Sequence, residues 1–268
     1  MIVTDRFVFL AFPRTGTTFV RNALKQLYRR RGLPLLARLG IGHRDQRGWL
    51  RELSTPMTDT ASAEFEGRRS PHGSFRQIPA EHRGLPVFSS FRNPFDLLVS
   101  GFEHRFWQQH PIRDVATLQH KYPGYPDLNF EQYVGMMLDD GVQDILRGKP
   151  NQARVGRLTL RFLKFYCREP DAVIDALSDD DVDGHDFSRD LAPVRFVHSE
   201  NLVAELRQVL ADFGVPPERT EFMIGLPRVN VAEARRDRPW TDYYSPKLRE
   251  RVRHAERLLF RLFPRYDR

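Results

Sequence analysis

Short apolar runs alternate along the chain with segments of helical periodicity. The apolar runs lie at residues 7–12, 85–91 and 194–198. Runs of this length that end in turn residues are typical of strands buried on both faces. Helical patterns follow them, from near Val20, from Pro94 to about Trp107, and from Leu202 to near Gly214. This alternation predicts an α/β protein.

Further helices are expected at 129–139, at 157–167 and from Ser245 onward, where Ser245 is a fitting N-cap and Pro246 a fitting first residue. The last helix is expected to pack against the sheet. Residues 108–128 and the acidic segment 179–190 are expected to be loops. The whole chain, 1–268, is thus predicted to form one domain of three layers, with a central, mainly parallel β-sheet flanked by helices. Ligands of such sheets bind at the carboxyl ends of the strands.

The segment Pro13-Arg14-Thr15-Gly16-Thr17-Thr18 joins the first apolar run to the first helix. The first N–H groups of a helix have no partner within it, so a short glycine-containing loop presents them to an anion. Arg14 adds a positive charge, and the threonines add hydroxyl donors. An ordinary strand-to-helix turn is the alternative, which this number of donors disfavours. Without a Walker A motif or an obvious magnesium-binding aspartate, a magnesium-dependent NTPase is also disfavoured.

A second element with the character of an anion site follows the apolar run 85–91. Arg92 stands at its carboxyl end, and Pro94 suits the first turn of the helix that follows. Ser100 then lies roughly two turns into this helix and faces the same crevice. Alone, the arginine and the serine are unremarkable. Paired with the first loop, they predict a second phosphate pocket for one ligand.

These two elements resemble the sulfotransferases that use 3′-phosphoadenosine 5′-phosphosulfate (PAPS). In that family a Pro-Lys-Ser-Gly-Thr-Thr-Trp-like loop binds the 5′-phosphosulfate, and an Arg-x7-Ser element binds the 3′-phosphate. The resemblance implies a P-loop-like fold, PAPS as the sulfuryl donor, adenosine 3′,5′-bisphosphate as the product, and no metal. It assigns the cofactor to Arg14, Thr15, Gly16, Thr17, Thr18, Phe19, Arg92 and Ser100. Arg14 stands at a lysine position, and Phe19 stands at a tryptophan position with a smaller face for the adenine.

The resemblance also implies a general base between the two phosphate elements. In hydroxyl-directed members a histidine precedes a proline by seven residues, and His72 and Pro79 reproduce this spacing. An imidazole suits removal of a proton from an alcohol, because its ordinary pKa lies near neutral pH. His82 is a competitor, and Glu64 or Glu66 is the local choice if the base is a carboxylate, as in some carbohydrate members. The expected catalytic residues are His72 and Arg14.

Three other segments bear on the donor or the acceptor. Ser199 stands where the family often has a tyrosine that reaches the adenine. The basic loop 230–240, with Arg235, Arg236 and Arg238, stands where a late loop of the family folds over the 3′-phosphate. Aromatic residues after Ser100 are expected to belong to the core, with an acceptor pocket as the alternative: Phe102, His104, Phe106 and Trp107.

Composition and charge bear on the cellular location of the protein and on the kind of ligand it binds. A single cysteine, Cys167, excludes an internal disulfide, and no apolar stretch approaches the roughly 20 residues that cross a membrane. The chain start lacks the layout of a signal peptide, so a cytoplasmic protein of bacterial type is expected. The net charge of +7, from 42 Lys plus Arg against 35 Asp plus Glu, suits a polyanionic donor but is unspecific. The segment 27–36 also makes a peripheral contact with an anionic membrane surface conceivable, although a solvated helix end followed by a packed loop is favoured.

The expected function is transfer of a sulfuryl group from PAPS to a hydroxyl, less readily an amine, of an acceptor such as a carbohydrate or glycolipid. Two other classes are kept as alternatives. A P-loop-like nucleotide kinase would require magnesium and ATP. A basic, non-catalytic nucleic-acid-binding protein would rest on the charge alone, and nucleic acid is not expected as a partner.

Overall fold

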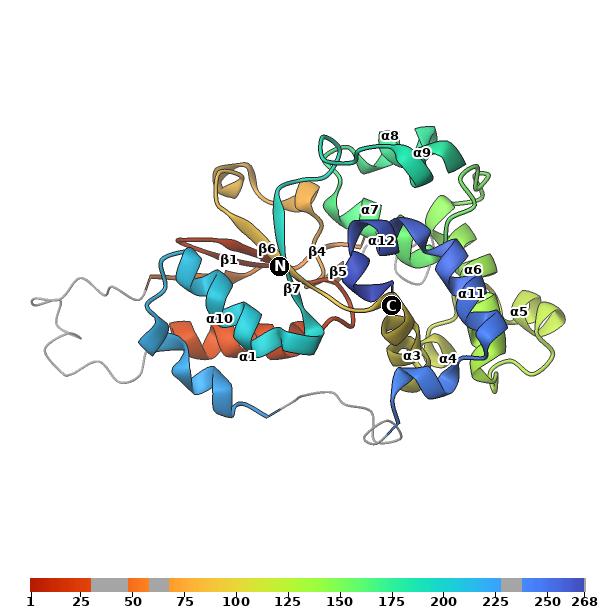
Figure 1. Ribbon diagram of the computed structural model, residues 1–268, viewed down its shortest axis with the longest axis horizontal. Coiled ribbons are helices and arrows are strands. Elements are labelled where there is room, and N and C mark those ends of the chain that lie inside the picture. The colour runs from red at the N-terminus through yellow and green to blue at the C-terminus, as the bar shows by residue number, and fades with distance from the viewer. Residues whose placement is uncertain (30–47, 58–67, 228–237, 268) are drawn as a thin grey trace, which may run out of the picture.

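The computed structural model describes residues 1–29, 48–57, 68–227 and 238–267. At its centre is a five-stranded mixed sheet with the strand order β3-β1-β2-β6-β7 (Figure 1). The strands are β1 (Ile2–Thr4), β2 (Val8–Leu10), β3 (Leu50–Glu52), β6 (Val87–Phe91) and β7 (Val194–His198). β2, β6 and β7 are parallel neighbours, whereas β1 pairs antiparallel with both β2 and β3. The α/β class is confirmed, and the sheet is parallel at its centre.

The three central strands end at the same edge of the sheet. In the register, Leu10 of β2 lies opposite Ser89 of β6, and Phe91 of β6 lies opposite His198 of β7. The residues that follow these strands are therefore neighbours, although they are far apart in sequence. A separate two-stranded ribbon, β4 (Thr55–Pro56) with β5 (Arg69–Ser70), leads into the segment that holds His72.

Helices pack on both faces of the sheet. On one face lie α1 (Thr17–Tyr28) and α10 (Leu202–Asp212), which Figure 1 shows side by side beneath the strands. Their apolar sides share a core with the fully buried rings of Phe7, Phe9 and Phe88. Each Å² of apolar surface removed from water stabilises the folded protein by about 25 cal/mol. The apolar surface buried in this contact is therefore the main source of stability on that face.

The other face is covered by α7 (Arg157–Tyr166) and by α12 (Arg257–Leu262) with the residues that follow it. The ring of Phe263 stacks on Phe91 of the central strand at 4.2 Å between centroids, and Phe162 of α7 contacts both rings. The C-terminal segment thus packs against the sheet.

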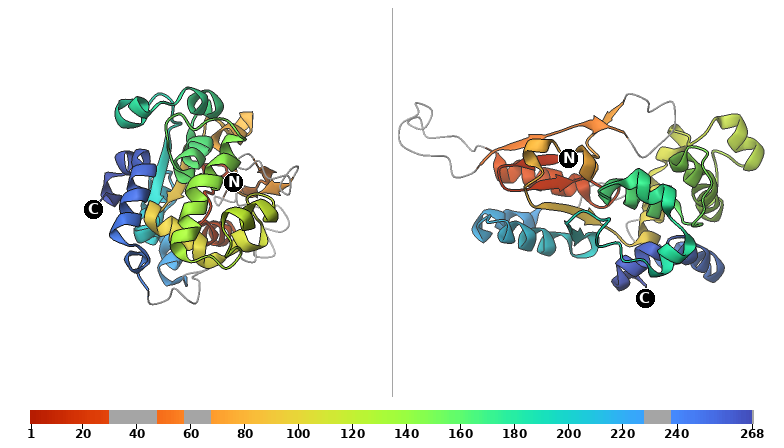
Figure 2. Two further views of the ribbon diagram at one scale, coloured as in Figure 1. Left: turned by 90° about the vertical axis from the view of Figure 1, so that its right-hand side faces the viewer. Right: turned by 90° about the horizontal axis from the view of Figure 1, so that it is seen from above.

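The remaining helices gather beyond the carboxyl edge of the central strands, as the two views of Figure 2 show. They are α3 (Pro94–His104), α4 (Phe106–Gln109), α5 (Val115–Lys121), α6 (Phe130–Leu146) and α11 (Pro246–Ala255). α8 (Pro170–Ala176) and α9 (Asp179–Gly184) follow α7. The 3-10 segments are η2 (Phe75–Gln77), η3 (Ala80–His82), η4 (Ser199–Asn201), η5 (Pro217–Gly225), η7 (Trp240–Tyr243) and η8 (Pro264–Tyr266).

Two predicted loops contain short helices, and two predicted helices are interrupted. Within 108–128, α5 is capped by Asp114, whose carboxylate accepts the Thr117 N–H at 2.8 Å. Within 179–190, Ser178 begins α9 with a reciprocal capping box. The helix after Pro94 ends at His104 because Arg105 adopts φ +55°. The last helix is divided at Glu256 into α11 and α12.

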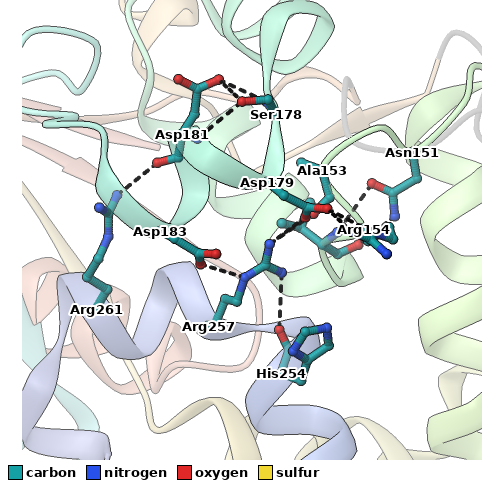
Figure 3. Close-up of polar contacts among 11 residues, drawn as sticks. Asn151, Ala153, Arg154, Ser178, Asp179, Asp181, Asp183, His254, Arg257 and Arg261 are labelled. Carbon is teal, nitrogen blue, oxygen red and sulfur yellow. Dashed lines mark hydrogen bonds and ion pairs between the residues drawn. The ribbon is translucent and has the colours of Figure 1, made fainter.

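An ion-pair network explains why the acidic segment folds as a helix (Figure 3). The Arg257 guanidinium donates to Asp179 at 2.5 Å and to Asp183 at 2.8 Å. Arg261 donates to the backbone carbonyl of Asp181 at 3.3 Å. Arg257 therefore neutralises Asp179 and Asp183, and it docks α9 against α12 together with Arg261. None of the helices in the described ranges is long and apolar enough to span a bilayer.

Candidate functional site

The loop between β2 and α1 turns through two left-handed residues. Arg14 has φ +68° and Gly16, the N-cap of α1, has φ +84°. A Cβ atom on Gly16 would lie 2.7 Å from Leu202 Cδ2, so both the conformation and the close approach require glycine. Because Gly16 has no side chain to cap the helix, the first N–H groups of α1 are suited to an anion.

One of the loop threonines, Thr15, holds the loop in place. Thr15 is fully buried, and its Oγ1 donates to the Phe12 carbonyl at 2.8 Å and lies 2.8 Å from Ser90 Oγ of β6. Thr17 is also buried, whereas Thr18 is half-buried. Thr15 therefore anchors the loop to the neighbouring strand, and any contact of Thr15 with a ligand would come from its backbone N–H.

Arg92 lies beside this loop, as the strand register requires. Its Nη1 donates to the Arg14 carbonyl at 3.4 Å, and its Nε donates to Asp96 at 2.5 Å. Burial lowers the pKa of Arg92 to about 10, against the opposing effect of Glu200, so the side chain stays charged at neutral pH. Asp96 and Ser100 are four residues apart in α3 and share one face of this helix. Asp96 thus orients the Arg92 guanidinium, whose Nη1 reaches the loop that holds Arg14.

His72 reaches the same edge of the sheet from a distant part of the chain. Its Nδ1 lies 2.8 Å from the carbonyl oxygen of Ala11, the residue that follows β2. Its backbone N–H donates to Ser70 Oγ at 3.1 Å. Since a carbonyl only accepts, this contact assigns the proton of a neutral ring to Nδ1 and the lone pair to Nε2. Such a tautomer is the one that a general base requires.

His82 lies elsewhere. It belongs to η3, which precedes β6 and is therefore at the amino ends of the parallel strands. Its ring contacts Trp49, just before β3, at 5.6 Å between centroids. Geometry thus separates the two histidines: His72 is at the edge with Arg14 and Arg92, and His82 is at the opposite edge.

Sequence analysis missed two residues at this site, Arg161 of α7 and Tyr133 of α6. Burial lowers the pKa of Arg14, and the positive charges of Arg161 and Arg92 lower it further, while Tyr133 opposes the shift. Tyr133 is fully buried, which raises its pKa to about 12. Positive charge is therefore concentrated around Arg14. No local sequence signal marked these two residues, because each looks like an ordinary position of an amphipathic helix.

The aromatic residues after Ser100 divide between the core and the surface. Phe102 and Trp107 pack against Tyr133, at 5.5 and 5.3 Å between ring centroids, which confirms the core interpretation for both. Phe106, in contrast, is 42% exposed, and His104 is exposed as well. Burial and the charge of Arg14 lower the pKa of His104, which places this histidine within electrostatic reach of Arg14. For these two residues the core interpretation is wrong.

The residues expected to contact the adenosine are placed differently from the family pattern. Phe19 is 7% exposed on the core-facing side of α1, so little of its ring remains for an adenine. Ser199 begins η4, where Glu200 accepts the Asn93 N–H at 3.3 Å and the Tyr266 hydroxyl at 3.0 Å. The C-terminal turn η8 is thereby tied to the segment that holds Arg92.

Several expectations fall outside the described residues. Glu64, Glu66, Arg235 and Arg236 lie there, as does most of the segment 27–36, of which Leu27 and Tyr28 are buried in the core with α1. Arg238 is described: it donates to the Asp242 carbonyl at 2.8 Å, and its guanidinium lies 3.9 Å from the centroid of the Tyr243 ring.

Within the described part of the chain, no group of three His, Cys, Asp or Glu residues is placed to hold a metal ion. The residues suited to a ligand are instead cationic and lie at the carboxyl ends of β2 and β6. No protein-family model, curated protein or solved structure matches the chain. Its function is therefore inferred from the geometry of this site and from the resemblance of its motifs.

Proposed function

We propose that the protein is a PAPS-dependent sulfotransferase with a three-layer, P-loop-like fold. The observation that carries this proposal is the direct contact between the two anion-binding elements, Arg92 Nη1 to the Arg14 carbonyl at 3.4 Å. Two cationic pockets so close together suit one ligand with two phosphate groups. The phosphosulfate would bind at Arg14 and the N-terminus of α1, and the 3′-phosphate at Arg92 and Ser100. No metal takes part in this proposal.

The reaction is an in-line transfer. The acceptor oxygen forms a bond to sulfur as the bond between sulfur and the bridging phosphate oxygen breaks, and the acceptor proton passes to His72 Nε2. Negative charge grows on the 5′-phosphate, which leaves as part of adenosine 3′,5′-bisphosphate. Arg14, with Arg161 nearby, stabilises this charge. By analogy with phosphoryl transfer, positioning and preorganised charge supply most of the rate.

The acceptor is proposed to be a hydroxyl of a carbohydrate or glycolipid. A screen of acceptors with labelled PAPS tests both the reaction class and the acceptor class. Label should move to a saccharide hydroxyl with release of adenosine 3′,5′-bisphosphate. Transfer from ATP in the presence of magnesium, with none from PAPS, would instead establish the nucleotide-kinase alternative.

The variant Arg92→Ala is expected to weaken binding of adenosine 3′,5′-bisphosphate about 100-fold, or ~3 kcal/mol, since it removes a charge-assisted contact to a dianionic phosphate. Binding of adenosine 5′-monophosphate, which has no 3′-phosphate, should change little. Isothermal titration calorimetry with both nucleotides separates these effects.

Arg251→Ala is the matched control, because Arg251 is an exposed arginine of α11 that pairs with Asp139 at 3.5 Å. It removes the same charge at a distance from the site and should leave both affinities unchanged. Equal losses for the two nucleotides in Arg92→Ala would show that Arg92 does not recognise the 3′-phosphate.

A further inference from the structure

Glu256, at the junction of α11 and α12, is a fully buried carboxylate that bonds across to another helix. Its Oε1 accepts the Leu158 N–H at 3.0 Å, and its Oε2 accepts the N–H and the hydroxyl of Thr159, both at 2.7 Å. These residues form the first turn of α7, whose N-cap is Gly156. Glu256 therefore supplies from a distant part of the chain the cap that Gly156 lacks.

The approach of the two segments is close. A Cβ atom on Gly156 would lie 2.1 Å from Glu256 Oε1, and the Gly156 N–H donates to the Ala255 carbonyl at 2.7 Å. Glycine is thus required for the carboxylate to reach the helix end. The start of α7 is fixed by both the backbone and the side chain of one short segment.

Helix α7 packs against the start of the phosphosulfate loop, where the ring of its Phe165 lies 5.0 Å from that of Phe12 between centroids, and the helix also carries Arg161. Arg161 lies two residues after Thr159, about 3 Å further along the helix axis. Its positive charge acts on Arg14 and on Tyr133. A displacement of the first turn of α7 would therefore also move the charge of Arg161, which acts on Arg14.

We propose that Glu256 is a positioning residue for the phosphosulfate end of the site: its carboxylate fixes the first turn of α7, and α7 in turn fixes Arg161 beside Arg14. This inference rests on the proposed function. It adds two residues to the proposed site: Arg161, which would interact with the leaving phosphate, and Glu256, which positions Arg161.

Glu256→Gln tests this role most specifically, because glutamine keeps the size of the side chain. Its amide oxygen can still accept, but its NH2 group would face a backbone N–H and leave that donor unsatisfied. Glu256→Gln is expected to raise the Kd for adenosine 3′,5′-bisphosphate about tenfold, as measured by calorimetry at pH 8, where the wild-type carboxyl group is mostly ionised, on protein shown to be folded by circular dichroism. Hydrogen exchange of residues 157–161 should also become faster than in the wild type.

Val209→Ala is the matched control for a general loss of stability. Val209 is fully buried on the core-facing side of α10, on the opposite face of the sheet. Its truncation removes two buried methyl groups and destabilises the protein without touching α7, and should leave the nucleotide affinity within twofold of the wild type.

A double-mutant cycle shows whether Glu256 acts through Arg161. Arg161→Ala should weaken binding about as much as Glu256→Gln or more, and the double variant should bind no more weakly than Arg161→Ala alone. Losses that add fully, or a folded Glu256→Gln protein with wild-type affinity, would overturn the inference and leave the proposed function standing. If the wild type itself fails to bind the bisphosphate, the proposed function and this inference both fail.

The protonation of Glu256 gives a separate prediction for stability. Burial raises the pKa of Glu256 from 4.5 to about 7, against the opposing effect of its three hydrogen bonds. The folded protein then binds more protons than the unfolded chain between these values, so the contribution of this group is largest below pH 4.5 and is lost as pH rises to about 7.

Urea denaturation between pH 5 and pH 8 checks this prediction in the wild type and in Glu256→Gln. The titratable group that faces Glu256 is Tyr244, while Arg157 pairs with Asp144 and Arg257 with Asp179 and Asp183. The difference in unfolding free energy between the two proteins should therefore change with pH through this one carboxyl group. A difference that is independent of pH would show that Glu256 keeps its ordinary pKa.

Discussion

Replacing Arg14 by alanine is expected to lower kcat for transfer from PAPS by about 10²- to 10³-fold, the usual cost of removing one preorganised donor from a developing negative charge. The affinity for adenosine 3′,5′-bisphosphate should fall less, by about tenfold, because the full charge on the leaving phosphate exists only after transfer begins. Arg14 is half-buried next to Arg92 and Arg161, where water screens charges weakly. Steady-state kinetics with labelled PAPS measure the effect.

Arg14→Lys distinguishes the charge from the shape of this side chain. The sulfotransferases that the motif resembles have lysine at this position, and an ammonium can follow the bridging oxygen while a guanidinium forms a planar fork. We expect Arg14→Lys to keep kcat within about tenfold of the wild type, which would assign most of the role to the positive charge. An Arg14→Ala enzyme with unchanged kcat would remove Arg14 from the catalytic step.

His72→Ala is expected to lower kcat by about 10²- to 10⁴-fold, the range for loss of a general base, with little change in binding of adenosine 3′,5′-bisphosphate. The reason is the contact of His72 Nδ1 with the Ala11 carbonyl at 2.8 Å, which holds the ring at the edge where PAPS would bind.

His82→Ala is the matched control, since it removes a histidine at the opposite edge of the same sheet. Its kcat should equal that of the wild type. If His72→Ala transferred at the wild-type rate, another group would have to be the base, while the donor site would be unaffected.

The central strands could be predicted because their buried residues are consecutive in the sequence. β2 and β6 are buried at every residue, and β7 is at least partly buried apart from the exposed Arg195, so each lies in a short segment rich in apolar residues. β1 has only three residues and pairs antiparallel with β2, which makes the sheet mixed where a mainly parallel one was expected.

The short helices α5 and α9 were missed for a different reason. Their apolar faces are small, with Leu118 and Val182 as their only buried apolar residues among those described, so the periodicity is weak. Both begin with a capping side chain, Asp114 and Ser178, and these caps were the signal available in the sequence. Ion pairs such as Arg257 with Asp179 depend on tertiary contacts and have no local signal.

The residues of the candidate site likewise divide into those with a local sequence signal and those placed by tertiary contacts. Arg14 and Arg92 belong to motifs whose residues are adjacent in sequence, and adjacent parallel strands bring them together. Arg161, Tyr133 and Glu256 come from segments that are distant in the sequence from both motifs, and tertiary packing sets their positions. An acidic residue next to arginines in a helix, as Glu256 is, has the pattern of a solvent-exposed position, whereas this one is fully buried.

Calorimetric titration of the wild-type protein with adenosine 3′,5′-bisphosphate tests the two-phosphate donor site most directly. We predict a single site per chain with a Kd in the micromolar range, about −8 kcal/mol, unchanged by EDTA or magnesium. Adenosine 5′-monophosphate should bind about 100-fold more weakly, because it leaves the pocket of Arg92 and Ser100 empty. The absence of bisphosphate binding, or tighter binding of ATP that requires magnesium, would contradict this assignment.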